Sequence, residues 1–116
     1  MTVCIYHNPR CSKSRDTLAL LHAQGLTPTV VAYLDTPPDA ATLREVLAKL
    51  GLSDARALMR KGEAEYTDLH LADPSLSQEA LIAAMVAHPR LIERPIVVNG
   101  NKAAIGRPPE QVLAIL

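Results

Sequence analysis

Apolar residues follow two different spacings along this chain, and the change between them predicts the order of its elements. A short unbroken apolar run over Val3–Tyr6 is typical of a strand that is buried on both faces. A helical pattern follows from Ser12 and ends at Gly25, because glycine is favoured just past the C-terminus of a helix. The β-branched run Thr29–Tyr33 then predicts a second strand. This strand, helix, strand order predicts a parallel pair joined by a right-handed crossover.

The middle of the chain is predicted to be helical. Thr36 is a favoured helix cap, and Pro37 suits the first helical position after it. The helix that follows has one apolar stripe with spacings of three and four residues, formed by Leu43, Val46, Leu47 and Leu50, and it ends at Gly51. Further helical stretches are predicted after a cap at Ser53, over residues 63–71, and over residues 79–88, where Ser77 is the cap and Pro89 the stop.

The last part of the chain returns to strands. Residues 96–98 and 102–105 are predicted strands on either side of a turn at Asn99 and Gly100, which is the pattern of an antiparallel hairpin. Pro108 and Pro109 then open a final helix. The complete order is βαβ, a helical insert, and ββα. It predicts an α/β protein with a thioredoxin-like fold and a four-stranded mixed sheet, as one domain over residues 1–116.

Composition narrows the class of protein. The charges of twelve basic and twelve acidic residues cancel, so the chain has no net positive charge with which to bind polyanions in general. Nucleic acid is therefore not an expected partner. The two cysteines form no disulfide framework and fit a reducing compartment. Apolar runs stay well short of the ~20 residues of a membrane span, and the start of the chain lacks the pattern of a secretion signal. We therefore expect a soluble, cytoplasmic protein without a membrane partner.

Cys11 is the strongest candidate for chemistry. It lies where the first strand passes into the first helix, and the first N–H groups of a helix attract anions such as a thiolate. Arg10, Lys13 and Arg15 add positive charge nearby, and His7 is placed to donate to the sulfur or to orient it. The same donors suit a tetrahedral oxyanion. The alternative is a buried structural cysteine, which is common for free cysteines.

Three further arginines stand out by position. In a thioredoxin-like layout the loop before the third strand lies beside the cysteine loop, so Arg94 and Arg107 are predicted to converge on Cys11. Arg60 follows a short predicted helix. Guanidinium groups bind oxyanions through two parallel hydrogen bonds and stay charged. Each arginine taken singly is more typical of a solvated surface residue, and it is the set of three that favours an oxyanion site. The Pro95 peptide bond is predicted to be cis, because thioredoxin-like folds place a cis-proline at the entrance to this strand.

Four segments of the chain match one family. They are His-Asn-Pro-Arg-Cys-Ser-Lys-Ser-Arg at residues 7–15, Leu-Met-Arg-Lys-Gly-Glu-Ala-Glu-Tyr at 58–66, Glu-Arg-Pro-Ile-Val-Val at 93–98, and Ile-Gly-Arg-Pro-Pro-Glu-Gln-Val-Leu at 105–113. With these segments the chain resembles the glutaredoxin-coupled arsenate reductases, the ArsC family, and within it the shorter branch that carries Cys-Ser-Lys-Ser. The resemblance covers essentially all 116 residues.

The resemblance implies an enzyme that reduces arsenate or a related oxyanion. Cys11 would be the nucleophile, and the oxyanion would be bound by Arg60, Arg94 and Arg107. The residues that would tune the thiol and form the anion loop are His7, Ser14 and Arg15. No bound cofactor and no metal are expected. Glutathione would supply the electrons and glutaredoxin would be the partner protein, because Ser14 stands where a Cys-x-x-Cys pair has its second cysteine.

Other functions are open at this point. A redox-sensing adaptor that binds RNA polymerase has a related fold but uses a Cys-x-x-Cys switch, which Ser14 removes. A monothiol glutaredoxin-like protein would exchange disulfides and would have no oxyanion pocket. A stable domain with a vestigial cysteine is the third alternative. The low-molecular-weight tyrosine phosphatase scaffold is excluded, because it needs an arginine where this chain has Thr17.

Overall fold

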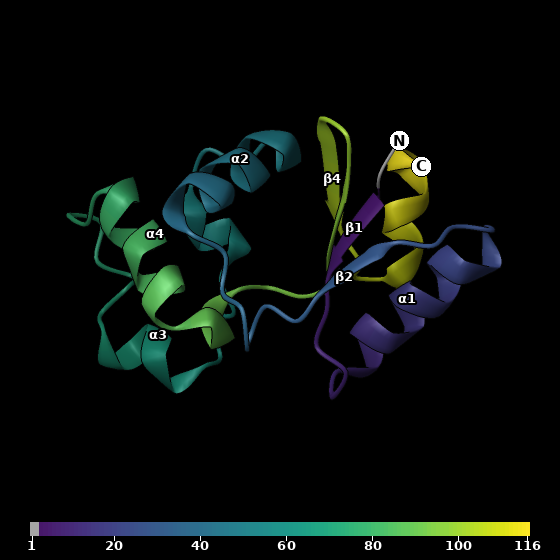
Figure 1. The fold of residues 1–116 in the computed structure, drawn as a ribbon. Coiled ribbons are helices and arrows are strands. Elements are labelled where there is room, and N and C mark those ends of the chain that lie inside the picture. Colours follow the sequence, from purple (N-terminus) through teal and green to yellow (C-terminus); the bar gives the residue numbers. More distant parts are fainter. Residues whose placement is uncertain (1–2) are drawn as a thin grey trace. The chain divides into compact units, whose positions relative to one another are not determined.

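The computed structural model describes residues 3–116 and divides them into two compact units (Figure 1). The first unit runs up to Thr36 and resumes at Arg94, so it holds both ends of the chain. The second unit is the helical segment between them, Pro37–Glu93. The expectation of a single domain over the whole chain stays a prediction.

The first unit contains the sheet. Its strands β1 (Val3–Tyr6), β2 (Thr29–Val31), β3 (Ile96–Asn99) and β4 (Lys102–Ile105) lie in the order β2-β1-β3-β4. The pair β1 and β2 is parallel, whereas β3 is antiparallel to both β1 and β4. This is the mixed four-stranded sheet expected from the sequence, and the thioredoxin-like fold is confirmed.

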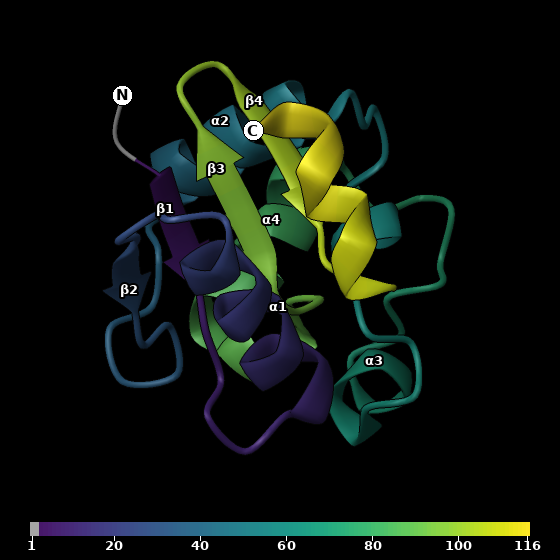
Figure 2. The same cartoon turned by 90° about the vertical axis from the view of Figure 1, so that its right-hand side faces the viewer.

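Helices α1 (Ser12–Ala23) and η3 (Pro109–Ile115) cover the same face of this sheet, in front of the strands in Figure 2. The final helix is a 3₁₀ helix. The core between helices and sheet is entirely aliphatic, as expected for a chain without Phe or Trp. Its buried members are Val3, Ile5, Leu21, Val97 and Val112.

The first strand departs from the expectation in its burial. Val3 and Ile5 are buried, but Cys4 and Tyr6 between them are only half-buried. Successive side chains of a strand point to opposite faces, so one face of β1 carries the core and the other is partly accessible. The expectation of a strand buried on both faces was therefore wrong.

The second unit consists of short helices. They are α2 (Ala40–Leu50), η1 (Ala55–Leu58), α3 (Ala64–Asp68), α4 (Gln78–Ala87) and η2 (Pro89–Leu91). Ser77 caps α4 as predicted, with its hydroxyl accepting from the Ala80 N–H at 3.1 Å. The cap of α2 is Asp39 rather than Thr36, because the Asp39 carboxylate accepts from the Thr42 N–H at 2.8 Å. Gly51 ends α2 with φ at 73°, in the left-handed region that favours glycine.

Two predicted elements are shorter than expected. The second strand ends at Val31, because the Asp35 and Thr36 N–H groups both bond to the Ala32 carbonyl and form a turn. The helix predicted over residues 63–71 is only Ala64–Asp68.

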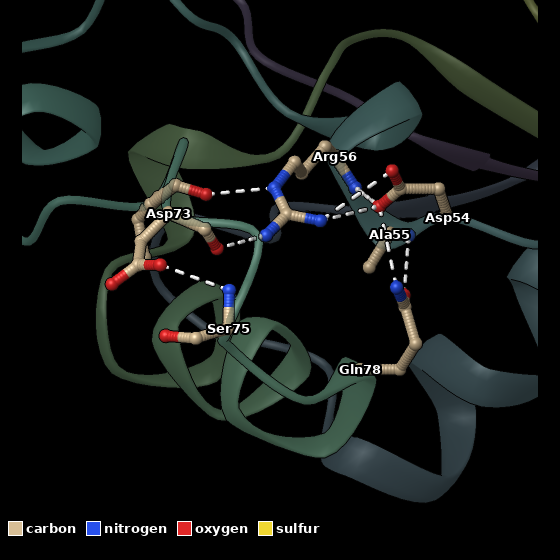
Figure 3. A network of polar contacts seen from close by, with 7 residues as sticks. Asp54, Ala55, Arg56, Asp73, Ser75 and Gln78 are labelled. Carbon is tan, nitrogen blue, oxygen red and sulfur yellow. Dashed lines mark hydrogen bonds and ion pairs between the residues drawn. The ribbon is translucent and has the colours of Figure 1, made fainter.

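A polar network around Arg56 joins the segments of the second unit (Figure 3). Its Nε donates to the Leu71 carbonyl at 2.8 Å, and its Nη2 donates to the Asp73 carbonyl at 2.6 Å. Its Nη1 lies 3.3 Å from Asp54, the N-terminal cap of η1. One guanidinium therefore ties η1 to the loop that precedes α4.

Candidate active site

Cys11 lies at the N-terminal cap of α1, the position expected from the sequence. Its φ and ψ of −96° and 124° are extended, so the chain passes from β1 to the helix at this residue. Its backbone N–H donates to the Asn8 carbonyl at 3.0 Å, and its own carbonyl accepts from the Arg15 N–H at 3.0 Å. The sulfur is thus held at the positive end of the α1 dipole.

Two arginines of the first unit, Arg94 and Arg107, reach Cys11. Arg107 Nη2 lies 3.7 Å from the Cys11 Sγ, and the Arg94 side chain also hydrogen-bonds to this sulfur. Arg107 is held by a second contact, because its Nε donates to the Arg94 carbonyl at 2.7 Å. The structure thus brings together Cys11, Arg94 and Arg107, as expected from the sequence.

The backbone at both arginines has an unusual form. The Arg94–Pro95 peptide bond is cis, which is the isomer that the sequence analysis favoured. The Arg107–Pro108 bond is cis as well. The sequence analysis did not consider the second, although an Arg-Pro step occurs at both places.

The surroundings of Cys11 lower the pKa of its thiol. Burial is the largest single influence and raises the pKa, because only 9% of Cys11 is exposed. The Ser14 N–H, the hydrogen bond and charge of Arg94, and the Lys13 N–H act in the opposite direction and together outweigh it. The Cys11 side chain forms no helix-cap hydrogen bond of conventional geometry. The N–H groups of Lys13 and Ser14 nevertheless stabilise its thiolate. The result is a sulfur that ionises more easily than an ordinary cysteine.

This lowered pKa predicts the pH dependence of thiol alkylation. In a Cys4→Ser background only Cys11 can react, and the thiolate is the reactive form. Acidification should therefore slow the reaction with iodoacetamide only once the pH falls below the lowered pKa. The midpoint of the rate against pH is expected below the ~8.5 of a free cysteine. A midpoint at or above that value contradicts the description of this sulfur.

His7 supports the Cys11 thiolate indirectly, through a hydrogen bond to Ser14. Its Nδ1 lies 2.6 Å from the Ser14 Oγ, and this hydroxyl also accepts from the Asn8 N–H at 3.0 Å. Burial, and secondarily the charge of Arg15, lower the pKa of His7, so its ring is neutral at pH 7. The hydrogen bonds of His7 and Asn8 hold the residue whose backbone N–H supports the Cys11 thiolate.

The other cations of the loop have different roles. Arg15 Nη1 donates to the Pro9 carbonyl at 2.9 Å, so Arg15 braces the loop in addition to contributing charge. The side chains of Arg10 and Lys13 are exposed. The charge that lowers the pKa of the Cys11 thiol is that of Arg94, and Arg107 contacts the sulfur; both lie far away in the sequence.

Asn8 is a site residue that the sequence analysis missed. It is buried, and its Oδ1 accepts from the Arg10 N–H at 3.0 Å while its carbonyl accepts from Cys11. Asparagine commonly bonds to the backbone two residues further on and so forms turns. The Asn-Pro pair in the sequence was the available signal for this turn.

Arg60 belongs to the second unit, where carboxylates surround it. Its backbone N–H donates to the Leu91 carbonyl at 2.7 Å and places it beside the end of that unit. Its Nη1 pairs with Glu63 at 2.6 Å, and its Nε lies 3.8 Å from Glu93. The role of Arg60 in oxyanion binding stays a prediction.

Comparison with known proteins decides the family. The model of the ArsC family matches residues 6–115. The chain belongs to the ArsC family. It is 65% identical to the uncharacterized protein YfgD of Escherichia coli (strain K12) over 114 residues, which are 98% of this chain and 96% of the other. It is 51% identical to an arsenate reductase of Haemophilus influenzae, with all of both chains covered.

A solved structure supports the same assignment. The structure of an arsenate reductase from Vibrio cholerae is 57% identical in sequence and superposes with a TM-score of 0.98. The match covers 100% of this chain and 98% of that one. The geometry around Cys11 therefore occurs in a chain whose fold and sequence both place it in the ArsC family. No helix within residues 3–116 of this ArsC-family chain is both long and apolar enough to span a membrane.

Proposed function

We propose that the protein is an arsenate reductase in which Cys11 is the nucleophile. The observation that carries the proposal is the contact of Arg107 with the Cys11 sulfur at the start of α1, in a chain of the ArsC family. A thiolate beside guanidinium groups is prepared both to attack an oxyanion and to neutralise its charge. Relatives about 50% identical carry the name arsenate reductase, which supports arsenate as the substrate.

The first step forms a bond between sulfur and arsenic. The Cys11 thiolate attacks the arsenic of bound arsenate, a sulfur–arsenic bond forms, and an arsenic–oxygen bond breaks. The departing oxygen takes up protons and leaves as water, and arsenic remains in its +5 state. Arg94 and Arg107 offset the charge that the remaining oxygens carry, and Arg60 is proposed as a third donor to them.

The second step supplies two electrons from glutathione. The glutathione thiolate attacks the Cys11 sulfur, so that a disulfide forms and the sulfur–arsenic bond breaks. The electron pair of that bond stays on arsenic, which leaves as arsenite in the +3 state. Glutaredoxin then attacks the glutathione sulfur of the mixed disulfide and releases the Cys11 thiolate. An external thiol is needed because position 14 is serine. The need for reduced glutathione is consistent with a cytoplasmic protein.

The test is NADPH oxidation in the presence of glutathione reductase, glutathione and glutaredoxin, started by adding arsenate. We expect one arsenite for each NADPH consumed, with arsenite measured separately by chromatography. Omission of glutathione and glutaredoxin should stop the reaction after the first adduct. If the protein turns over a glutathione mixed disulfide with glutathione and glutathione reductase alone, but does not reduce arsenate in the full assay, it is a monothiol glutaredoxin-like protein and the proposal is wrong.

A further inference from the structure

Gly106 lies where the residues around the sulfur meet. It is buried, and its N–H donates to the Pro95 carbonyl at 2.9 Å. The next residue, Arg107, donates from Nε to the Arg94 carbonyl at 2.7 Å. These two hydrogen bonds hold the segment at residues 94–95 against the segment at residues 106–107. Both arginines that reach Cys11 therefore move with the backbone at Gly106.

There is no space for a side chain at Gly106. A Cβ atom at this position would lie 2.9 Å from the Cγ of Pro95 and 3.1 Å from the Cγ2 of Thr17, and closer still to the Thr17 hydroxyl. A carbon atom does not approach its neighbours this closely without displacing them. The glycine thus lets the backbone at residues 106–107 lie directly against helix α1.

Thr17 is the residue of α1 that makes this contact. It is fully buried, and its hydroxyl donates to the Lys13 carbonyl at 2.8 Å, which holds the side chain in one orientation. It lies six residues after Cys11, a rise of about 9 Å along the same helix. Because a helix is stiff, the point at which Thr17 meets Gly106 determines how far the start of α1 lies from the two arginines.

We propose that the contact between Thr17 and Gly106 sets the separation between the Cys11 sulfur and the guanidinium groups of Arg94 and Arg107. Thr17 and Gly106 are positioning residues, since they act through the arginines. A hydrogen bond to sulfur weakens when its partners separate, so a displaced backbone at residues 106–107 loses both thiolate stabilisation and anion binding. The part that concerns arsenate rests on the proposed function, whereas the part that concerns the thiol does not.

The experiment compares Gly106→Ala, Thr17→Ala and the double variant. Gly106→Ala should raise the pKa of the Cys11 thiol toward its ordinary value and raise the KM for arsenate roughly 10-fold or more. Thr17→Ala should change both quantities in the same direction by less, because it loosens the contact without a clash. The double variant should lie closer to wild type than Gly106→Ala, since the new methyl group occupies the space that the threonine side chain vacates.

Gly62→Ala is the matched control, because a Cβ atom there meets nothing within 4 Å. It should leave the thiol pKa unchanged. If Gly106→Ala does not fold, Thr17→Ala decides the question, since alanine favours a helix more than threonine does. Folded variants with lower Tm but an unchanged thiol pKa overturn the proposal. A shifted thiol pKa in a protein that never reduces arsenate supports the positioning role and contradicts only the proposed function.

Discussion

Cys11→Ser is expected to reduce arsenate turnover by about 10³-fold or more, without unfolding the protein. The serine hydroxyl has almost the same size, but it is not ionised near neutral pH and cannot form the sulfur–arsenic bond. Removal of a nucleophile therefore lowers kcat rather than KM. The measurement is the coupled assay with NADPH, together with mass spectrometry for a glutathione adduct, which should be absent.

The chain provides its own control for this variant. Cys4 is the other cysteine, it lies on β1, and it is half-buried. Cys4→Ser should retain near wild-type turnover and should still form the glutathione adduct. Equal activity of the Cys11→Ser and Cys4→Ser proteins would show that the reacting sulfur has been assigned wrongly.

The second large effect is expected for Arg107→Ala. This substitution removes the Nη2 contact with the sulfur at 3.7 Å and the Nε bond to the Arg94 carbonyl at 2.7 Å. Loss of one preorganised donor to a developing oxyanion commonly costs 10²–10³-fold in rate, about 2.7–4 kcal/mol. We therefore expect a fall of roughly 10²-fold in kcat/KM for arsenate, and a higher thiol pKa for Cys11. Arg94→Ala is expected to have an effect of similar size, since Arg94 also hydrogen-bonds to the sulfur.

Two further variants separate charge from geometry. Arg107→Lys keeps the charge but lacks the planar fork that joins the Arg94 carbonyl to the sulfur, so its activity should be intermediate. Arg44 is an exposed arginine that pairs with Glu79 at 2.7 Å in the second unit, and Arg44→Ala should have little effect. If Arg44→Ala and Arg107→Ala lower kcat/KM equally, the loss reflects net charge and the role given to Arg107 is wrong.

Arg60 shows why residue type alone does not define an anion site. Its guanidinium pairs with Glu63 at 2.6 Å and lies 3.8 Å from Glu93. Glu63 also lies 3.4 Å from Arg90. Carboxylates three and thirty-three residues away compensate its charge, and only the nearer one was a local signal in the sequence. An oxyanion that binds Arg60 must compete with these partners.

Local patterns in the chain were sufficient for most elements of the fold. The strand β1, the hairpin of β3 and β4, and the cap at Ser77 all occur as predicted, because each depends on neighbouring residues. The hairpin turn lies one residue later than predicted, at Gly100 and Asn101, because Asn99 is the last residue of β3 and pairs with Lys102. The same holds for Cys11, whose place between a strand and a helix could be recognised from spacing alone. Where two local signals competed the prediction was wrong, as at α2, where Asp39 rather than Thr36 forms the cap.

Contacts between distant segments could not be predicted in this way. The lowered thiol pKa of Cys11 depends on Arg94, and its contact with Arg107 joins residues 96 positions apart. Gly106 gave no signal in the sequence, because its importance comes from the Thr17 side chain that packs where a Cβ would lie. Strands, turns and caps depend on short-range backbone energetics that neighbouring residues specify. Close packing and electrostatic fields depend on distances in space, and only the folded chain sets those distances.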